Sequence, residues 1–195
     1  MTTNRAVSLA LAALLVTGCG FQSIPRSENA VAAAWGEVQN QYQRRADLVP
    51  NLVETVKGYA SHERETLEAV VAARAQATQV KLSVDELTPE NMKKFEAAQG
   101  QLRSALGRLL AVAENYPQLK ANENFRDLQV QLEGTENRIS VARRRYIDQV
   151  RQFNDLVTVP PTSWTNALVY HKQPEAQFTA TTEGAERAPE VKFTK

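Results

Sequence analysis

A long apolar stripe in the second half of the chain constrains the fold more than any other feature. From Phe125 to Val157, with Leu132 among them, apolar residues recur at alternating intervals of three and four. This spacing places them on one face of a single α-helix for more than four heptads. At 1.5 Å per residue the helix is roughly 50 Å long. Other helices must cover that face, so the sequence predicts an elongated helical domain.

Three further helical segments precede this stripe. Thr88-Pro89-Glu90 opens one of them, with a capping threonine and a proline in the first turn. Upstream, an apolar stripe over 31–59 has Pro50 in its middle. Because a proline removes one backbone hydrogen bond, we expect a bend or break near 45–50. The expected helical pieces cover about 27–48, 50–81, 88–115 and 122–157.

No segment alternates with a period of two, so no strand is predicted. Four helices with short connectors predict an all-α fold, an elongated antiparallel up-and-down four-helix bundle whose first long helix is kinked near Pro50. The connector 117–121 is short enough to make the helices on either side of it antiparallel neighbours. After Val157 the pattern fails, and the polar tail 171–195 is expected to be flexible.

The only cysteine, Cys19, follows Val16-Thr17-Gly18 at the end of an apolar run, which is the pattern at which bacterial lipoproteins are cut and lipidated. Arg5 and the apolar run 6–16 have the organisation of an export signal. The run is too short for a membrane-spanning helix, which needs roughly 20 apolar residues. We therefore expect a signal peptide at 1–18, a lipidated tether at 19–26 and a helical domain at 27–170.

Lipidation of Cys19 would also determine where the protein lies. One acyl chain holds a protein to a bilayer weakly, whereas the three chains of bacterial lipoprotein processing hold it stably. The next residue is Gly20, where an aspartate would signal retention in the inner membrane. We expect a lipid-anchored, extracytoplasmic protein of the bacterial cell envelope. In a host with two membranes, we expect it on the periplasmic side of the outer one.

Composition argues against several classes of function. Loss of Arg5 with the signal reduces the 23 basic residues to 22, against 22 acidic ones, so the exported part is formally neutral. A nucleic-acid binder would show a basic excess, and we expect no nucleic-acid partner. His62 and His171 are far apart, and no zinc-helix, nucleophile-elbow or glycine-rich phosphate motif is present. We expect no metal, no cofactor, no catalytic residue and no enzymatic activity.

Two polar segments contain the candidate site residues, and several interpretations are open. Asn122 can cap a helix and Arg44 can pair with Asp47 on a solvated face. Alternatively, some of the charges pair across the bundle and fix which helices are neighbours. A third interpretation is a groove for a small ligand or peptide, and a fourth is a hydrolase site. The candidates are Arg44, Arg45, Asp47, Asn51, Lys120, Asn122, Asn124, Glu133, Glu136 and Arg138.

The same segments resemble the LemA family. The first stretch, 44–59, reads Arg-Arg-Ala-Asp-Leu-Val-Pro-Asn-Leu-Val-Glu-Thr-Val-Lys-Gly-Tyr. The second, 116–125, reads Tyr-Pro-Gln-Leu-Lys-Ala-Asn-Glu-Asn-Phe, and 132–139 follows with Leu-Glu-Gly-Thr-Glu-Asn-Arg-Ile. The resemblance covers about residues 28–170.

The resemblance implies a membrane-tethered extracytoplasmic domain, built as a four-helix up-and-down bundle without established catalytic activity. In many members of the family the amino end looks like a transmembrane helix, whereas Cys19 indicates a lipid anchor here. The resemblance assigns no catalytic residues. We therefore expect a non-enzymatic envelope scaffold or protein-interaction module with an envelope protein as partner. A small-ligand or peptide-binding bundle is the alternative.

Overall fold

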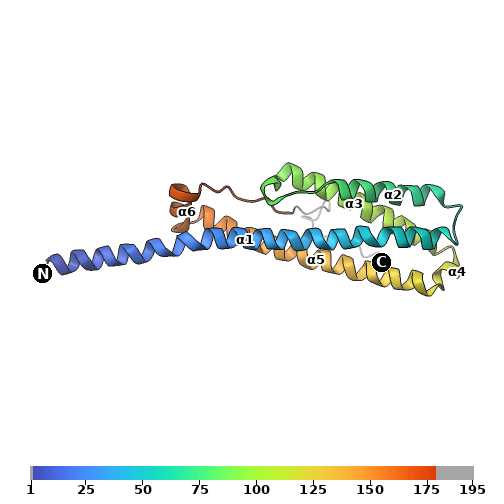
Figure 1. Ribbon diagram of the computed structural model, residues 1–195, viewed down its shortest axis with the longest axis horizontal. Helices are drawn as coiled ribbons and strands as arrows, with labels where there is room; N and C mark the ends of the chain where they lie inside the picture. The colour runs from blue at the N-terminus through green and yellow to red at the C-terminus, as the bar shows by residue number, and fades with distance from the viewer. Residues whose placement is uncertain (1, 179–195) are drawn as a thin grey trace, which may run out of the picture.

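The computed structural model is all-helical in the part of the chain that it describes, the backbone of residues 2–178 and the side chains of 21–178. Figure 1 shows long helices lying along one axis, with the amino end of α1 projecting beyond the others. No strand occurs in this part of the chain, as predicted. The elements are α1 (Thr2–Lys57), α2 (Arg64–Gln79), the 3-10 turn η1 (Val84–Glu86), α3 (Pro89–Ala113), α4 (Pro117–Lys120), α5 (Glu123–Thr158), α6 (Thr162–Thr165) and the π-helical turn η2 (Asn166–Tyr170).

Helices α1 and α5 lie side by side, and α2 packs on both α1 and α3. The apolar stripe predicted for the long helix is the buried face of α5. One apolar cluster, near the start of the domain, is aromatic: the Trp35 ring lies 5.2 Å from Phe95 and 5.4 Å from Tyr146, between centroids. A second cluster is mainly aliphatic and takes side chains from all four long helices. The core therefore has two apolar parts along its length.

Helix α1 does not break at Pro50, so of the bend or break predicted near 45–50 the break is wrong, while the kink stays a prediction. A proline at 50 leaves the carbonyl of Ala46 without its helical N–H donor. In the structure, Nε of Arg74 in α2 donates to this carbonyl at 2.8 Å. The chain reverses after Lys57 instead, so the predicted piece 50–81 is divided between the end of α1 and α2.

Pro25 shows the same arrangement near the start of the domain. It frees the carbonyl of Phe21, which accepts a hydrogen bond from the Tyr170 hydroxyl at 2.6 Å. Residues 21–26, which we predicted as a tether, are therefore part of a helix that packs on the domain, and Ile24 is fully buried. The prediction of a separate tether is wrong for these residues.

The amino-terminal part of α1 contains the predicted signal and lipidation site. Cys19 falls on this helix, but its side chain lies outside the described residues. In the part of the chain that the structure describes, no helix is both long enough and apolar enough to cross a bilayer.

The predicted flexible tail packs against the bundle as far as Phe178. Asn154 in α5 accepts a hydrogen bond from the Glu175 N–H and donates one to the Glu175 carbonyl. The Tyr146 hydroxyl donates to the carbonyl of Ala176 at 2.8 Å, and the Phe178 ring is buried against the aromatic cluster. The flexible-tail prediction is therefore wrong for 171–178, while 179–195 lie outside the described residues.

Candidate functional site

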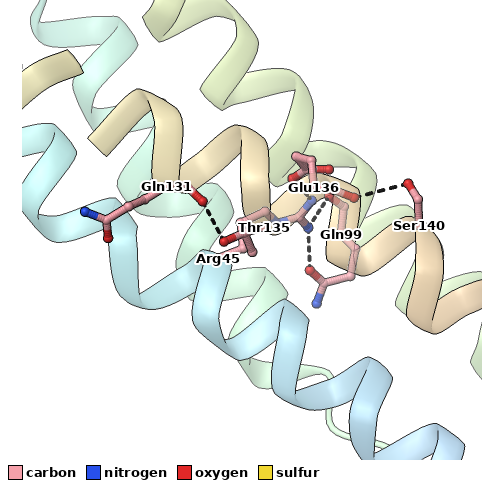
Figure 2. A network of polar contacts seen from close by, with 6 residues as sticks. All are labelled: Arg45, Gln99, Gln131, Thr135, Glu136 and Ser140. Atoms are coloured by element: carbon pink, nitrogen blue, oxygen red, sulfur yellow. Dashed lines mark hydrogen bonds and ion pairs between the residues drawn. The ribbon is translucent and has the colours of Figure 1, made fainter. Parts of the chain in front are cut away.

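Polar side chains cross the core between its two apolar clusters, and we call them the polar layer (Figure 2). At its centre, Arg45 of α1 is only 2% exposed. Its guanidinium donates to Oε1 of Glu136 in α5 at 2.9 Å. It also donates to Gln99 of α3, at 3.0 Å to the carbonyl and 2.7 Å to the side-chain oxygen. The polar layer comprises Arg45, Glu96, Gln99, Thr135, Glu136 and Arg143.

Gln99 extends the polar layer to the remaining long helix. Its side-chain amide donates to the carbonyl of Ala77 in α2 at 3.0 Å. Arg45 and Gln99 together therefore connect α1, α2, α3 and α5. Pairing across the bundle, one of the interpretations open from the sequence, is what the structure shows for Arg45 and Glu136.

A second ion pair flanks the first. Arg143 of α5 donates to Oε1 of Glu96 in α3 at 2.9 Å, and the Glu96 side chain is 5% exposed. The Arg143 guanidinium also lies 4.2 Å from the centroid of the Phe178 ring, a cation–π contact that helps to hold the tail. A buried carboxylate is stable only with such a partner.

Sequence reasoning did not include Glu96, Gln99 or Arg143 among the candidate site residues. A signal for Gln99 was present, because it lies three residues before Leu102 and so falls on the apolar stripe of α3. A polar residue at a stripe position indicates a buried polar contact. The identity of its partners is not encoded locally.

The electrostatics of the polar layer follow from its burial. Burial raises the pKa of Tyr42, and the positive charges of Arg143 and Arg45 oppose that rise. The Tyr42 ring centroid lies 5.0 Å from the Arg45 guanidinium carbon. Glu136 accepts from the buried Arg45, and Glu96 accepts from the partly buried Arg143. The arrangement thus joins helices and neutralises charge within the core.

Four of the predicted site residues lie on exposed helix faces and bond within their own helix or lack a cross-bundle contact. Asp47 accepts from Gln43 at 2.7 Å, so the predicted pair with Arg44 is not the contact observed. Glu133 accepts from Gln129 at 3.2 Å. The four are Arg44, Asp47, Glu133 and Arg138.

The predicted cap is present where α1 and α5 meet at the far end of the domain. Oδ1 of Asn122 accepts from the Phe125 N–H at 3.0 Å, which caps α5, and its side-chain amide donates to the Tyr59 hydroxyl at 3.0 Å. Lys120 forms an exposed ion pair with Glu114. These contacts tie the α1 end to the turn that precedes α5.

Asn51 and Asn124 line one open groove of about 430 Å³ between α1 and α5, with Glu54 and Asp127 beside them. Arg45 borders a separate cavity of about 130 Å³. A ligand site that used Arg45 and Asp47 together with the two asparagines would need one pocket joining them, and these described residues do not form one. Nor does any group of three or more His, Cys, Asp or Glu in the described part of the chain have the geometry to hold a metal.

Comparison with known proteins gives a family match. The model of the LemA family matches residues 34–193. Protein LemA of Metamycoplasma hominis is 26% identical over 143 residues, which cover 73% of this chain and 60% of that protein. The aligned region therefore spans less than two thirds of this relative's length.

Proposed function

The chain belongs to the LemA family, and from that premise we propose a membrane-anchored, non-enzymatic interaction module of the bacterial cell envelope. Acyl chains on Cys19 are the proposed anchor, on the extracytoplasmic side and in the outer membrane where the host has two. The four long helices are proposed to form an antiparallel up-and-down bundle that presents a contact surface to an envelope protein.

The use of the buried charges is the observation that carries this proposal. A catalytic acid or base has to reach a substrate. Here the carboxylates of the polar layer accept from arginines of other helices, Glu136 from Arg45 and the buried Glu96 from Arg143. The polar layer is therefore occupied in holding helices together, which favours a role through contact rather than through chemical turnover.

The length of α1 supports a contact surface away from the membrane. From Phe21 to Lys57 the helix is roughly 54 Å long at 1.5 Å per residue. The two stretches that carry the family resemblance, 44–59 and 116–139, lie beside each other in the far half of the domain. The groove lined by Asn51 and Asn124 lies between them. We assign this groove to the partner.

A small ligand or peptide in the same groove is the second candidate. Amide and carboxylate side chains line it, namely Asn51, Asn124, Glu54 and Asp127. Such groups can bond to the backbone of an extended peptide. A peptide or small ligand would leave the protein without a stable macromolecular partner, and this distinguishes the two candidates.

Site-specific photocrosslinking in living cells tests the proposed surface. A photoreactive amino acid at Asn124 probes the groove, and one at Val71, 53% exposed on α2, is the matched control. We expect a discrete protein adduct from position 124 that is absent from position 71. The same adducts from both positions, or none from 124, would contradict a protein partner at the groove. Peptide binding by the purified wild-type protein that is lost in the Asn124→Asp variant would instead favour the second candidate.

The anchor is tested separately by lipid labelling and mass measurement. We expect the mature chain to begin at acylated Cys19 and to fractionate with membranes, and Cys19→Ser to remain unlabelled. Label in the Cys19→Ser variant, or a native chain that is soluble and still begins at Met1, would refute the anchoring.

A further inference from the structure

Exposed apolar side chains gather at the end of the domain next to Cys19. Of the nine large apolar residues that are exposed in the described part of the chain, five lie there and are 46–80% exposed. The other four lie singly elsewhere: Tyr59 in the turn after α1, Val71 on α2, and Val130 and Val141 on α5. A contiguous apolar patch on a folded domain indicates an interaction site, whereas single exposed apolar residues do not. We call the five residues Phe21, Val159, Trp164, Leu168 and Val169 the apolar tip.

Direct contacts hold the apolar tip against the start of α1. The Tyr170 hydroxyl donates to the Phe21 carbonyl at 2.6 Å, and the two rings pack edge to face with centroids 6.4 Å apart. Lys172, just beyond, forms an ion pair with Glu28 of α1 at 2.6 Å. Figure 1 shows α6 beside α1 at the place where α1 leaves the other helices. The position of the tip relative to α1 is therefore fixed.

We propose that the apolar tip contacts the lipid surface, with Trp164 and Leu168 inserted among the headgroups of the membrane that carries the Cys19 anchor. This inference rests on the proposed lipidation of Cys19. Cys19 precedes Phe21 by two residues, about 3 Å along a helix axis. Acyl chains on Cys19 therefore enter the bilayer within a few ångströms of the tip.

The proposed contact is specific to the tip because residues 21–26 do not form a flexible linker between the anchor and the domain. Residues 21–26 are helical, and Ile24 is fully buried in the core. A flexible tether would let any face of the domain meet the lipid. A helix that is packed from its first residues brings the same end to the membrane each time.

The chemistry of the tip suits the headgroup region. Tryptophan is enriched there because its ring is apolar while its N–H still finds polar partners. Trp164 is 63% exposed and Leu168 is 80% exposed, so most of their apolar area is free to leave water on contact. The nearby positive charge of Lys172 is already paired with Glu28.

Tryptophan fluorescence provides the test, because the chain has two tryptophans in opposite environments. Trp35 is 1% exposed in the core, and Trp164 is 63% exposed at the tip. The mature lipidated protein is reconstituted into vesicles of phosphatidylethanolamine and phosphatidylglycerol that contain brominated acyl chains, which quench only rings in contact with lipid. Trp164→Phe isolates the Trp35 signal. Val130→Trp in the Trp164→Phe background places an exposed ring on the flank of α5, where Val130 is 67% exposed.

We expect brominated lipid to quench the wild-type emission, and insertion of the Trp164 ring to shift that emission to shorter wavelength. Brominated lipid should leave the Trp164→Phe variant and the Val130→Trp control unquenched. Quenching by aqueous iodide should affect the Val130→Trp control and spare Trp164. Wild-type emission that iodide quenches and brominated lipid does not would overturn the proposal. Protection of Trp164 from both quenchers would also overturn it, since a protein or a second copy would then cover the tip. The intact mass of the protein distinguishes failure of the tip proposal from failure of the anchor proposal. Acylated protein in which brominated lipid does not quench Trp164 refutes the lipid contact of the tip alone, and unacylated protein refutes the lipid anchor as well.

Discussion

Replacing Arg45 by methionine tests whether the polar layer stabilises the domain. Methionine keeps much of the side-chain volume and removes the charge. The substitution leaves the Glu136 carboxylate and the Gln99 acceptors without the donor that now lies 2.7–3.0 Å away. Arg44 precedes it on an exposed position, so Arg44→Met is a matched control that removes the same charge from the same helix.

The expected loss in unfolding free energy depends on how deeply the two partners are buried. Removing one partner of a buried ion pair costs about 3–5 kcal/mol. Arg45 is 2% exposed, but the Glu136 side chain is 32% exposed and recovers part of its hydration. We therefore expect a loss near the lower end, about 3 kcal/mol of unfolding free energy. In a chain of this length that lowers Tm by roughly 6–12 °C. Arg44→Met should change the unfolding free energy by about 0.5 kcal/mol at most.

Urea unfolding followed by far-ultraviolet circular dichroism measures both variants. Glu136→Leu and the double variant Arg45→Met/Glu136→Leu complete a double-mutant cycle. The double variant should be more stable than the sum of the single losses predicts, because it leaves no unpaired carboxylate. If Arg45→Met is as mild as Arg44→Met, or if the two losses add, the polar layer does not stabilise through this ion pair.

Three further predictions concern the helices and their cores. Arg74→Leu removes the donor to the carbonyl that Pro50 frees and should cost about 1–3 kcal/mol in urea unfolding. The same change should cost less in a Pro50→Ala background, where the new N–H replaces that donor, and equal costs in both backgrounds would argue against this capping. Burial raises the pKa of Tyr146 from its ordinary 10.0, so the stability that it contributes is fully present below pH 10 and is lost as the pH rises further. Tyr146→Phe should flatten the decline in unfolding free energy above pH 10, and an unchanged decline would show that other groups cause it. Leu132→Ala should cost on the order of 2–5 kcal/mol, because Leu132 is 5% exposed in the aliphatic cluster, and a Tm within one degree of the wild type would refute its place in the core.

The apolar stripes could be predicted from the sequence because helical spacing reports burial directly. From Phe125 to Val157 the stripe residues of α5 are buried, apart from Leu128, which is partly buried and packs against the aliphatic cluster. The path of α1 through Pro50 could not be predicted in the same way. Whether a helical proline ends a helix depends on whether the carbonyl that it frees finds another donor. Here that donor is Arg74 on α2, 28 positions from the carbonyl of Ala46.

The candidate site could be predicted only in part, because the sequence pattern identifies unusual residues but not their distant partners. Arg45 and Glu136 stood out as charged residues in dense polar segments, but their partnership spans 91 positions. Gln99, which bonds to both α1 and α2, carries no charge and belongs to no motif. Local patterns identify which residues are unusual, while tertiary packing decides what each of them meets.

The polar layer also determines the register of the helices, and thereby the spacing between the apolar tip and the distal groove. Along each of α1, α3 and α5, the polar residues other than Arg143 lie between the positions that belong to the aromatic cluster and those that belong to the aliphatic one. A slip of α1 by one turn, about 5.4 Å, would bring Val49 opposite Glu136 and bury Arg45 without its acceptors. Two unpaired charges make that register unfavourable by several kcal/mol, whereas an all-apolar layer would tolerate it. Because α1 runs without a break from the tip through this layer to Lys57, fixing the register at Arg45 also fixes how far the groove stands from the apolar tip.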